Sequence, residues 1–293
     1  MTTRNQGYFT EENSAEVVTG QIGPDTDPRL AEVMAAIVKH MHAAVKEIEP
    51  TQEEWLTAIK FLTETGHKSD DWRQEYILLS DILGVSMLVD AINNRKPSGA
   101  SESTVLGPFH IPDAPELPMG ANICLDGKGA PMLIKGRILN TKGEPISGAK
   151  IDVWQTNDDG FYDVQQKGIQ PDFNLRGVFR TGTDGTYTFW GAKPRFYPIP
   201  DDGPVGKLLG NMGRHPFRPA HLHYIVSADG YEELVTHIFD PDDEYIGSDA
   251  VFGVKESLLA KFELIEDAEQ IKAANQTGPY YEVVHDFVLA PES

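Results

Sequence analysis

Two histidines separated by one residue, His221 and His223, are the first candidates for chemistry in this chain. Residues i and i+2 of a β-strand project from the same face, so both imidazoles can reach one metal ion. A second pair, His40 and His42, lies in a segment with helical periodicity, where residues two apart point about 200° away from each other. We therefore expect the helical pair to be structural or solvent-facing. His221 and His223 are either metal ligands or core histidines.

Arg218 precedes this histidine pair in the sequence Arg218-Pro-Ala-His-Leu-His223. Its guanidinium is permanently charged and presents several donors to an anion. A cation beside metal-bound histidines suits an anionic substrate. The alternative for Arg218 is a surface ion pair, which is the common fate of an arginine in an acidic protein.

Two kinds of side chain can complete a metal site around the histidines. A two-histidine, one-carboxylate iron(II) site would take its carboxylate from Asp229, Glu233 or Asp240. Tyr162 and Tyr197 offer a different set, because a phenolate is a hard anionic ligand that suits Fe(III). Each tyrosine alone is also compatible with a half-buried aromatic ring that keeps its hydroxyl wet. The residue types leave both sets open.

Helical signals fill the first third of the chain. Apolar residues recur every three or four positions from Leu30 to Ile48, after Asp27 as an N-cap and Pro28 at the first helical position. A capping box at residues 51–54 predicts a second helix that ends near Gly66. Residues 69–87 predict a third helical region with a possible break at Gly84.

Short strands dominate the chain after a proline-rich connector at residues 97–120. Segments rich in β-branched and aromatic residues, punctuated by Gly, Pro, Asn and Asp, predict an antiparallel β-sandwich. The expected strands are 132–139, 150–156, 187–190, 221–227, 234–239 and 280–289, with a helix at 257–275. The predicted fold is an all-β sandwich catalytic domain, residues 106–293, preceded by an α-helical domain, residues 1–105.

Composition excludes several classes of partner. The chain has 25 Lys and Arg against 45 Asp and Glu, a net charge of −20. Such a surface argues against nucleic acid and against anionic membranes. The single cysteine, Cys124, excludes an internal disulfide and a cysteine-rich metal site, and fits the reducing cytoplasm. We find neither a secretory signal nor an apolar run of membrane-spanning length, and expect a cytoplasmic protein with a small-molecule substrate.

Taken in order, three segments resemble the intradiol ring-cleaving dioxygenases. They are Ile151-Asp-Val-Trp-Gln-Thr-Asn-Asp-Asp-Gly-Phe-Tyr162, Lys193-Pro-Arg-Phe-Tyr197-Pro-Ile-Pro200 and Arg218-Pro-Ala-His-Leu-His223. The helical front, especially residues 76–90 and 104–108, is similar to the catechol and hydroxyquinol branch of that family. The resemblance extends from about residue 28 to the C-terminus. The ordered set of two tyrosines, an arginine and a His-x-His motif carries it.

The resemblance implies a metal centre and a reaction. Tyr162, Tyr197, His221 and His223 would bind one non-haem Fe(III) per chain, with Arg218 over the substrate ring and Tyr197 taking a substrate proton. The enzyme would insert both atoms of O2 into an aromatic ortho-diol. Hydroxyquinol (1,2,4-trihydroxybenzene) would give 3-hydroxy-cis,cis-muconate, in equilibrium with maleylacetate. Catechol and chlorocatechol are alternative substrates, and a non-catalytic transthyretin-like sandwich module is the remote alternative.

A substrate pocket and a subunit arrangement also follow from the resemblance. We expect Asp81 to face the third hydroxyl of hydroxyquinol; the alternative is that it bonds within its own helical region. His237 stands where catechol enzymes usually carry a glutamine, fourteen residues after the second histidine. We expect a homodimer formed through the helical domain, with phospholipid at its interface in relatives. The expected pocket residues are Leu78, Asp81, Val105, Gly107, Pro108, Phe109, Ile199, Pro200, Arg218, His237 and Phe252.

Overall fold

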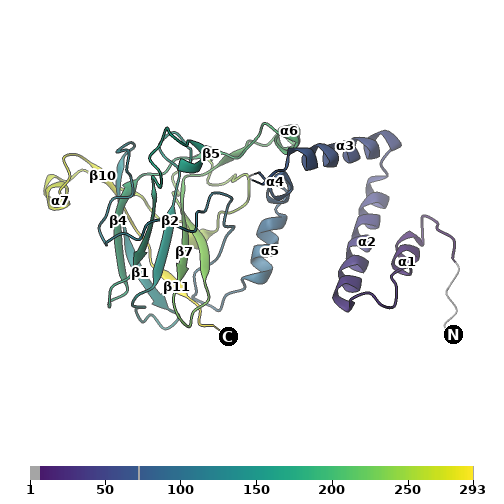
Figure 1. Cartoon of the computed structure of the whole chain (residues 1–293), viewed down its shortest axis with the longest axis horizontal. Coiled ribbons are helices and arrows are strands. Elements are labelled where there is room, and N and C mark those ends of the chain that lie inside the picture. The colour runs from purple at the N-terminus through teal and green to yellow at the C-terminus, as the bar shows by residue number, and fades with distance from the viewer. Residues whose placement is uncertain (1–6, 72, 293) are drawn as a thin grey trace. The chain divides into compact units, whose positions relative to one another are not determined.

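The computed structural model describes residues 7–71 and 73–292 (Figure 1). Its backbone contacts divide the chain into two compact units, one ending at Glu64 and the other beginning at Thr65. The boundary falls within helix α3 (Gln52–Lys68).

The first unit contains α1 (Ser14–Thr19), α2 (Pro28–Ile48) and most of α3. The side chain of Asp27 accepts a hydrogen bond of 2.9 Å from the backbone N–H of Leu30, which confirms the predicted N-cap. Thr51 and Glu54 form the predicted capping box, with reciprocal bonds of 2.8 and 3.2 Å. α3 continues past Gly66 to Lys68, so the predicted end of this helix is wrong by two residues.

The helices of the second unit bring α4 (Glu75–Ile82) against α6 (Pro204–Asn211). The carboxylate of Glu75 is fully buried and accepts from the backbone N–H of Val205 at 3.2 Å and from Arg73 Nε at 2.8 Å. α5 (Val85–Asn93) follows Gly84, whose φ of +72° produces the predicted break. These contacts fix the position of α4, which carries the expected pocket residues Leu78 and Asp81.

The first sheet of the second unit is mixed. It contains β1 (Pro131–Asn140), β4 (Thr186–Ala192), β9 (Glu263–Ile265), β10 (Tyr280–Val284) and β11 (Phe287–Leu289). β1 is antiparallel to β4 but parallel to β10 and β11. The long chain segment between β1 and β10 permits this parallel pairing, which a short hairpin does not.

The second sheet is antiparallel and carries the histidine pair. Its order is β3 (Arg176–Arg180), β2 (Lys150–Trp154), β7 (His221–Ser227) and β8 (Leu234–Phe239). A separate short ladder joins β5 (Tyr197–Pro198) to β6 (Phe217–Arg218). Leu222 lies in the apolar core together with residues of the first sheet such as Ile134 and Phe189. The predicted sandwich behind a helical region is therefore confirmed, and Figure 1 shows the two strand layers beside α4, α5 and α6.

One sequence prediction for the sandwich is wrong, and one strand was missed. The helix expected at residues 257–275 is instead a short 3-10 turn (Glu256–Leu258), strand β9 and a short helix, α7 (Ala268–Ala273). Leu258, Ala260 and Phe262 are buried at every second position, which is the period of extended chain. Strand β3, bounded by two arginines, was not predicted, because its burial depends on neighbouring strands. Within the described ranges no helix is long and apolar enough to cross a bilayer.

Candidate active site

Four polar atoms from three segments meet in the second unit. Tyr162 Oη lies 3.0 Å from Tyr197 Oη and 2.7 Å from His223 Nε2, and His223 Nε2 lies 3.2 Å from His221 Nε2. The histidines project from one face of β7, as their spacing predicts. Tyr162 ends the loop after β2, and Tyr197 is on β5. All four side chains are buried, with Tyr197 the least so at 7% exposure.

The geometry and chemistry of the four groups fit a cation. Ligands about 2 Å from a metal in tetrahedral array are separated by about 3.3 Å, close to these distances. Burial, and after it the neighbouring Tyr197, raises the pKa of the Tyr162 phenol well above its usual value. A phenolate in this place therefore requires a nearby positive charge. Burial and the charge of Arg218 lower the pKa of His221 to about 3, which leaves the imidazole neutral as a ligand must be.

Within the described residues, the groups that converge on the histidines as possible ligands include no carboxylate. Among residues 7–71 and 73–292, the His, Cys, Asp and Glu side chains that converge as a possible metal site are His221, His223 and His237. Asp240, one of the carboxylates considered from sequence, forms an ion pair of 2.6 Å with Lys193. The arrangement thus favours the tyrosine set over a two-histidine, one-carboxylate iron(II) site.

His223 is held from several sides. Trp154 is opposite it in the β2–β7 register, and the two rings stack with centroids 4.7 Å apart and an angle of 12°. His237, its register partner on β8, places Nε2 2.6 Å from His223 Nδ1. Gly107 has a φ of +77°, and a Cβ there would lie 3.1 Å from Cε1 of His223. Gly107, expected as a pocket residue, therefore also leaves room for the histidine ring.

Arg218 lies at the edge of this cluster because β6 pairs it with Tyr197 on β5. Its Nη1 is 3.3 Å from His221 Nε2, while Nε and Nη2 donate to the carboxylate of Asp249 at 3.2 and 3.3 Å. Burial alone would lower the pKa of Arg218, but Asp249 and Tyr197 outweigh it and the pKa is raised. Burial likewise opposes ionisation of Asp249, yet Arg218 holds its pKa below the usual value. The site therefore keeps a fixed cation.

Asp81 lies within the electrostatic field of Arg218. Burial raises the pKa of the Asp81 carboxyl; a hydrogen bond with Ser86 and the charge of Arg218 oppose the rise, and Asp249 adds to it. The bond with Ser86 is the alternative expected within the helical region, while the expected role of Asp81 toward a substrate stays a prediction. Burial makes the ionised form of Asp81 less favourable than it is in water, so a hydrogen-bond donor beside the carboxylate would stabilise it.

The other expected pocket residues have different surroundings. Phe109 stacks on Tyr162 with centroids 4.5 Å apart, and Ile199 is buried beside β5. Leu78, Val105 and Pro200 are partly buried, and Pro108 is exposed. Burial alone does not test whether these side chains contact the substrate, so those contacts stay predictions.

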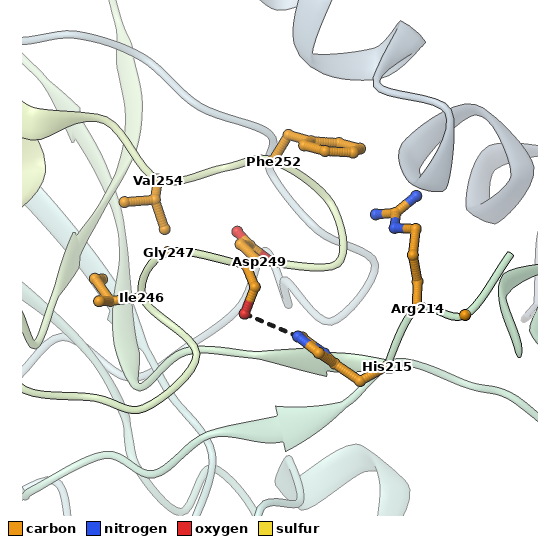
Figure 2. A pocket seen from close by; sticks show the side chains of 9 residues that line it. Arg214, His215, Ile246, Gly247, Asp249, Phe252 and Val254 are labelled. Atoms are coloured by element: carbon orange, nitrogen blue, oxygen red, sulfur yellow. Dashed lines mark hydrogen bonds between the residues drawn. The ribbon is translucent and has the colours of Figure 1, made fainter.

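Phe252 lies in a separate pocket of about 480 Å³ (Figure 2). Its ring is half-exposed, and the guanidinium carbon of Arg214 lies 4.7 Å from the ring centroid. His215 and Ser248, joined by a hydrogen bond of 2.8 Å, line the same pocket. Asp249 also borders it, whereas the four clustered side chains do not. Phe252 thus lines a pocket that Asp249 also borders, and its expected contact with substrate stays a prediction.

Sequence reasoning did not single out Trp154 or Asp249. The turn dipeptide Asp229-Gly230 is typical of hairpins and fits one between residues 221–227 and 234–239. A two-residue turn there would place residue 236 opposite residue 223, one position from the observed pair of His223 and His237, so the folded chain decides this register. No comparable local signal identifies Asp249, which is 31 residues from Arg218 in the chain.

Comparisons with known proteins identify the family. Residues 107–291 match the family model described as "Dioxygenase", and residues 27–101 match "Catechol dioxygenase N terminus". The chain is 70% identical over 290 residues to "Hydroxyquinol 1,2-dioxygenase" of Rhizobium sp. (strain MTP-10005), covering 99% of this chain and 98% of that one. The chain belongs to the intradiol dioxygenase family. The resemblance inferred from its motifs is confirmed.

Solved structures of intradiol dioxygenases share the fold over nearly the whole chain. Hydroxyquinol 1,2-dioxygenase from Pseudomonas putida DLL-E4 has a TM-score of 0.91 at 45% identity, covering 96% of this chain and 99% of that one. Catechol 1,2-dioxygenase from Acinetobacter sp. ADP1 has a TM-score of 0.82 at 29% identity, covering 95% and 91%. As an intradiol dioxygenase the protein is an enzyme, and an aromatic diol and O2 fit its family.

Proposed function

We propose that this intradiol dioxygenase acts on hydroxyquinol. It would insert both atoms of O2 between the two adjacent hydroxyl-bearing carbons, giving 3-hydroxy-cis,cis-muconate in equilibrium with maleylacetate. The observation that carries the proposal is the buried cluster of Tyr162, Tyr197, His221 and His223 in a chain 70% identical to a hydroxyquinol dioxygenase. Catechol and chlorocatechol are the alternative substrates.

The same four side chains are the proposed ligands of one Fe(III) per chain. Their donor set supports this assignment, because two phenolates and two neutral imidazoles suit a hard trivalent cation. When bound, the iron would make the diol reactive toward dioxygen. The protein's own contribution is to orient the diol, to move its protons and to supply a fixed positive charge.

We assign different roles to the two tyrosines from their surroundings. Tyr162 is fully buried and confined by the stacked Phe109 ring. Tyr197 lies on a two-residue strand and is slightly more exposed, so its phenol can move with less disturbance. Tyr197 Oη would accept one proton from the substrate diol, while Tyr162 stays in place.

Arg218 would stabilise negative charge that develops on the substrate ring. Its charge is permanent, its position is set by two bonds to Asp249, and it lies in buried surroundings where electrostatic interactions are strong. The guanidinium requires no reorganisation during the reaction. Its proximity to His221 Nε2 supports a place directly beside the bound diol.

Asp81 is our candidate for recognition of the third hydroxyl of hydroxyquinol. A buried hydroxyl without a partner costs about 1–3 kcal/mol, which corresponds to a selectivity of up to about a hundredfold. Burial takes water from the Asp81 carboxylate and raises its pKa, so a substrate hydroxyl that donates to it would replace part of the lost hydration. Catechol lacks that hydroxyl and leaves the carboxylate without this donor.

Oxygen uptake with hydroxyquinol, catechol and 4-chlorocatechol, together with product spectra, tests the substrate. We expect hydroxyquinol to have the highest kcat/KM. In Asp81→Ala, kcat/KM for hydroxyquinol should fall about ten- to a hundredfold relative to catechol. A parallel fall for both substrates would give Asp81 a structural role only. Faster turnover of catechol or 4-chlorocatechol by the wild-type enzyme would refute the proposed substrate.

We further propose that residues 1–105 form a helical domain through which two chains associate, with phospholipid at the interface. Exposed apolar side chains on α2 support this: Leu30, Met34, Ile37, Met41, Val45 and Ile48. Solvent exposure of such a stripe is unfavourable in a monomer. Light scattering should give twice the chain mass, and organic extraction followed by mass spectrometry should release phospholipid. A monomer without lipid would refute this arrangement.

A further inference from the structure

A buried histidine outside the four proposed ligands adjoins one of them. His237 lies on β8 directly opposite His223 on β7, and its side chain has no solvent exposure. Its Nε2 is 2.6 Å from Nδ1 of His223. The contact is on the side of the His223 ring opposite Nε2, the atom that faces Tyr162 and His221.

The position of a proton follows from this contact. A neutral imidazole carries one N–H, so a His223 that offers Nε2 to a cation must carry its proton on Nδ1. That Nδ1–H can only donate to His237 Nε2, which must then be an acceptor. The proton of His237 consequently lies on its own Nδ1.

The tautomer of His221 is fixed in the same way, by a different acceptor. Its Nδ1 lies 2.6 Å from the backbone carbonyl oxygen of Pro219, which can only accept. The proton is thereby fixed on Nδ1, and Nε2 is left bare toward the cluster. Both histidines of β7 thus have an acceptor behind them, a backbone carbonyl in one case and the His237 imidazole in the other.

The arrangement at His237 has a cost that packing alone does not explain. Across the described part of the chain, His237 Nδ1 is buried and has no hydrogen-bond partner. An unsatisfied buried donor costs about 1–3 kcal/mol. An apolar side chain would avoid this cost but would leave Nδ1–H of His223 without an acceptor.

We propose that His237 is a positioning residue for the metal centre, rather than a contact for the substrate. Its Nε2 accepts from Nδ1–H of His223, fixes the tautomer and orientation of that ring, and so strengthens the hold of the site on Fe(III). The inference rests on the proposed iron site. A glutamine at position 237 could replace the histidine in this role, since its amide oxygen accepts the same bond.

Two substitutions separate this role from packing. In His237→Leu an apolar side chain fills the space but offers no hydrogen-bond acceptor. In His237→Gln the amide oxygen Oε1 retains an acceptor. Loss of such a supporting hydrogen bond weakens metal binding about 10–100-fold. His285→Leu is a matched control, because it replaces another largely buried histidine in the sandwich, one that contacts Phe287.

The experiment measures three quantities: the rate at which a chelator removes Fe(III), the wavelength of the visible charge-transfer band from tyrosine to Fe(III), and the melting temperature of the iron-free protein. We expect His237→Leu to lose iron about 10–100-fold faster with a shifted band, and His237→Gln and His285→Leu to stay within about threefold of wild type. Equal iron retention in His237→Leu and wild type, or equal loss in the Leu and Gln variants, would overturn the inference. A wild-type protein that takes up no iron would overturn the proposed function as well, so the two failures are distinguishable.

Discussion

Replacing Gly107 by alanine should damage the iron site through one short contact. The φ of +77° costs a residue with a Cβ about 1–2 kcal/mol. In a unit of this size that cost lowers the melting temperature by about 2–8 °C. The new Cβ would also lie 3.1 Å from Cε1 of His223, whereas carbon atoms prefer about 3.5–4.0 Å. The histidine must therefore retreat by about 0.4 Å or more.

His223 has little freedom to make that movement. Trp154 is stacked on its ring, and the 2.6 Å contact with His237 fixes Nδ1. A displaced ring changes the direction of Nε2 toward Tyr162. We expect Gly107→Ala to hold Fe(III) about 10–100-fold more weakly, which is the usual effect of disturbing the support of a ligand.

Gly168→Ala provides the control. Gly168 has the same φ of +77°, but an added Cβ there meets no atom within 4 Å. Both variants should therefore lose similar thermal stability in the iron-free state, and only Gly107→Ala should lose iron rapidly to a chelator. Identical iron retention in the two variants would refute the argument, because the backbone cost would then be the whole effect.

Three further predictions concern the ligands and the helices. Tyr162→Phe should remove a phenolate and lose most iron and colour, whereas replacing both histidines of the α2 pair by alanine should leave iron content unchanged; a coloured Tyr162→Phe protein would contradict the ligand set. Glu75→Ala deprives Val205 N–H of its buried partner and should lower the free energy of unfolding in urea by about 2–3 kcal/mol, and a change below about 0.5 would contradict the role of this carboxylate. Hydrogen bonds from Lys68 and Arg73 lower the pKa of Asp202 to about 2, below its value in the unfolded chain, so the stability they confer is present above about pH 4 and is lost as pH falls toward 2. Since Asp202 is exposed, Asp202→Asn should cost under about 1 kcal/mol at pH 6 and progressively less in acid, and a cost that grows in acid would contradict this sign.

Local signals in the sequence determined the parts of this protein that depend on neighbouring residues. Asp27 and Pro28 start a helix because a cap and a first-turn proline act within four residues. His221 and His223 share a face because the side-chain period of a strand is two. The order of the tyrosine, arginine and histidine motifs identified the family, since that combination is highly specific.

The tertiary structure decided what depends on residues far apart in the chain. Residues 257–275 have apolar spacing compatible with a helix, but burial of alternate side chains against the sandwich makes much of the segment extended. β1 lies parallel to β10 and β11, a pairing over more than a hundred residues that no local pattern encodes. The contacts of Gly107 and His237 with His223 likewise arise from strand register and loop packing. Sequence type and spacing thus predicted the donor groups, while the surroundings that orient them required the folded chain.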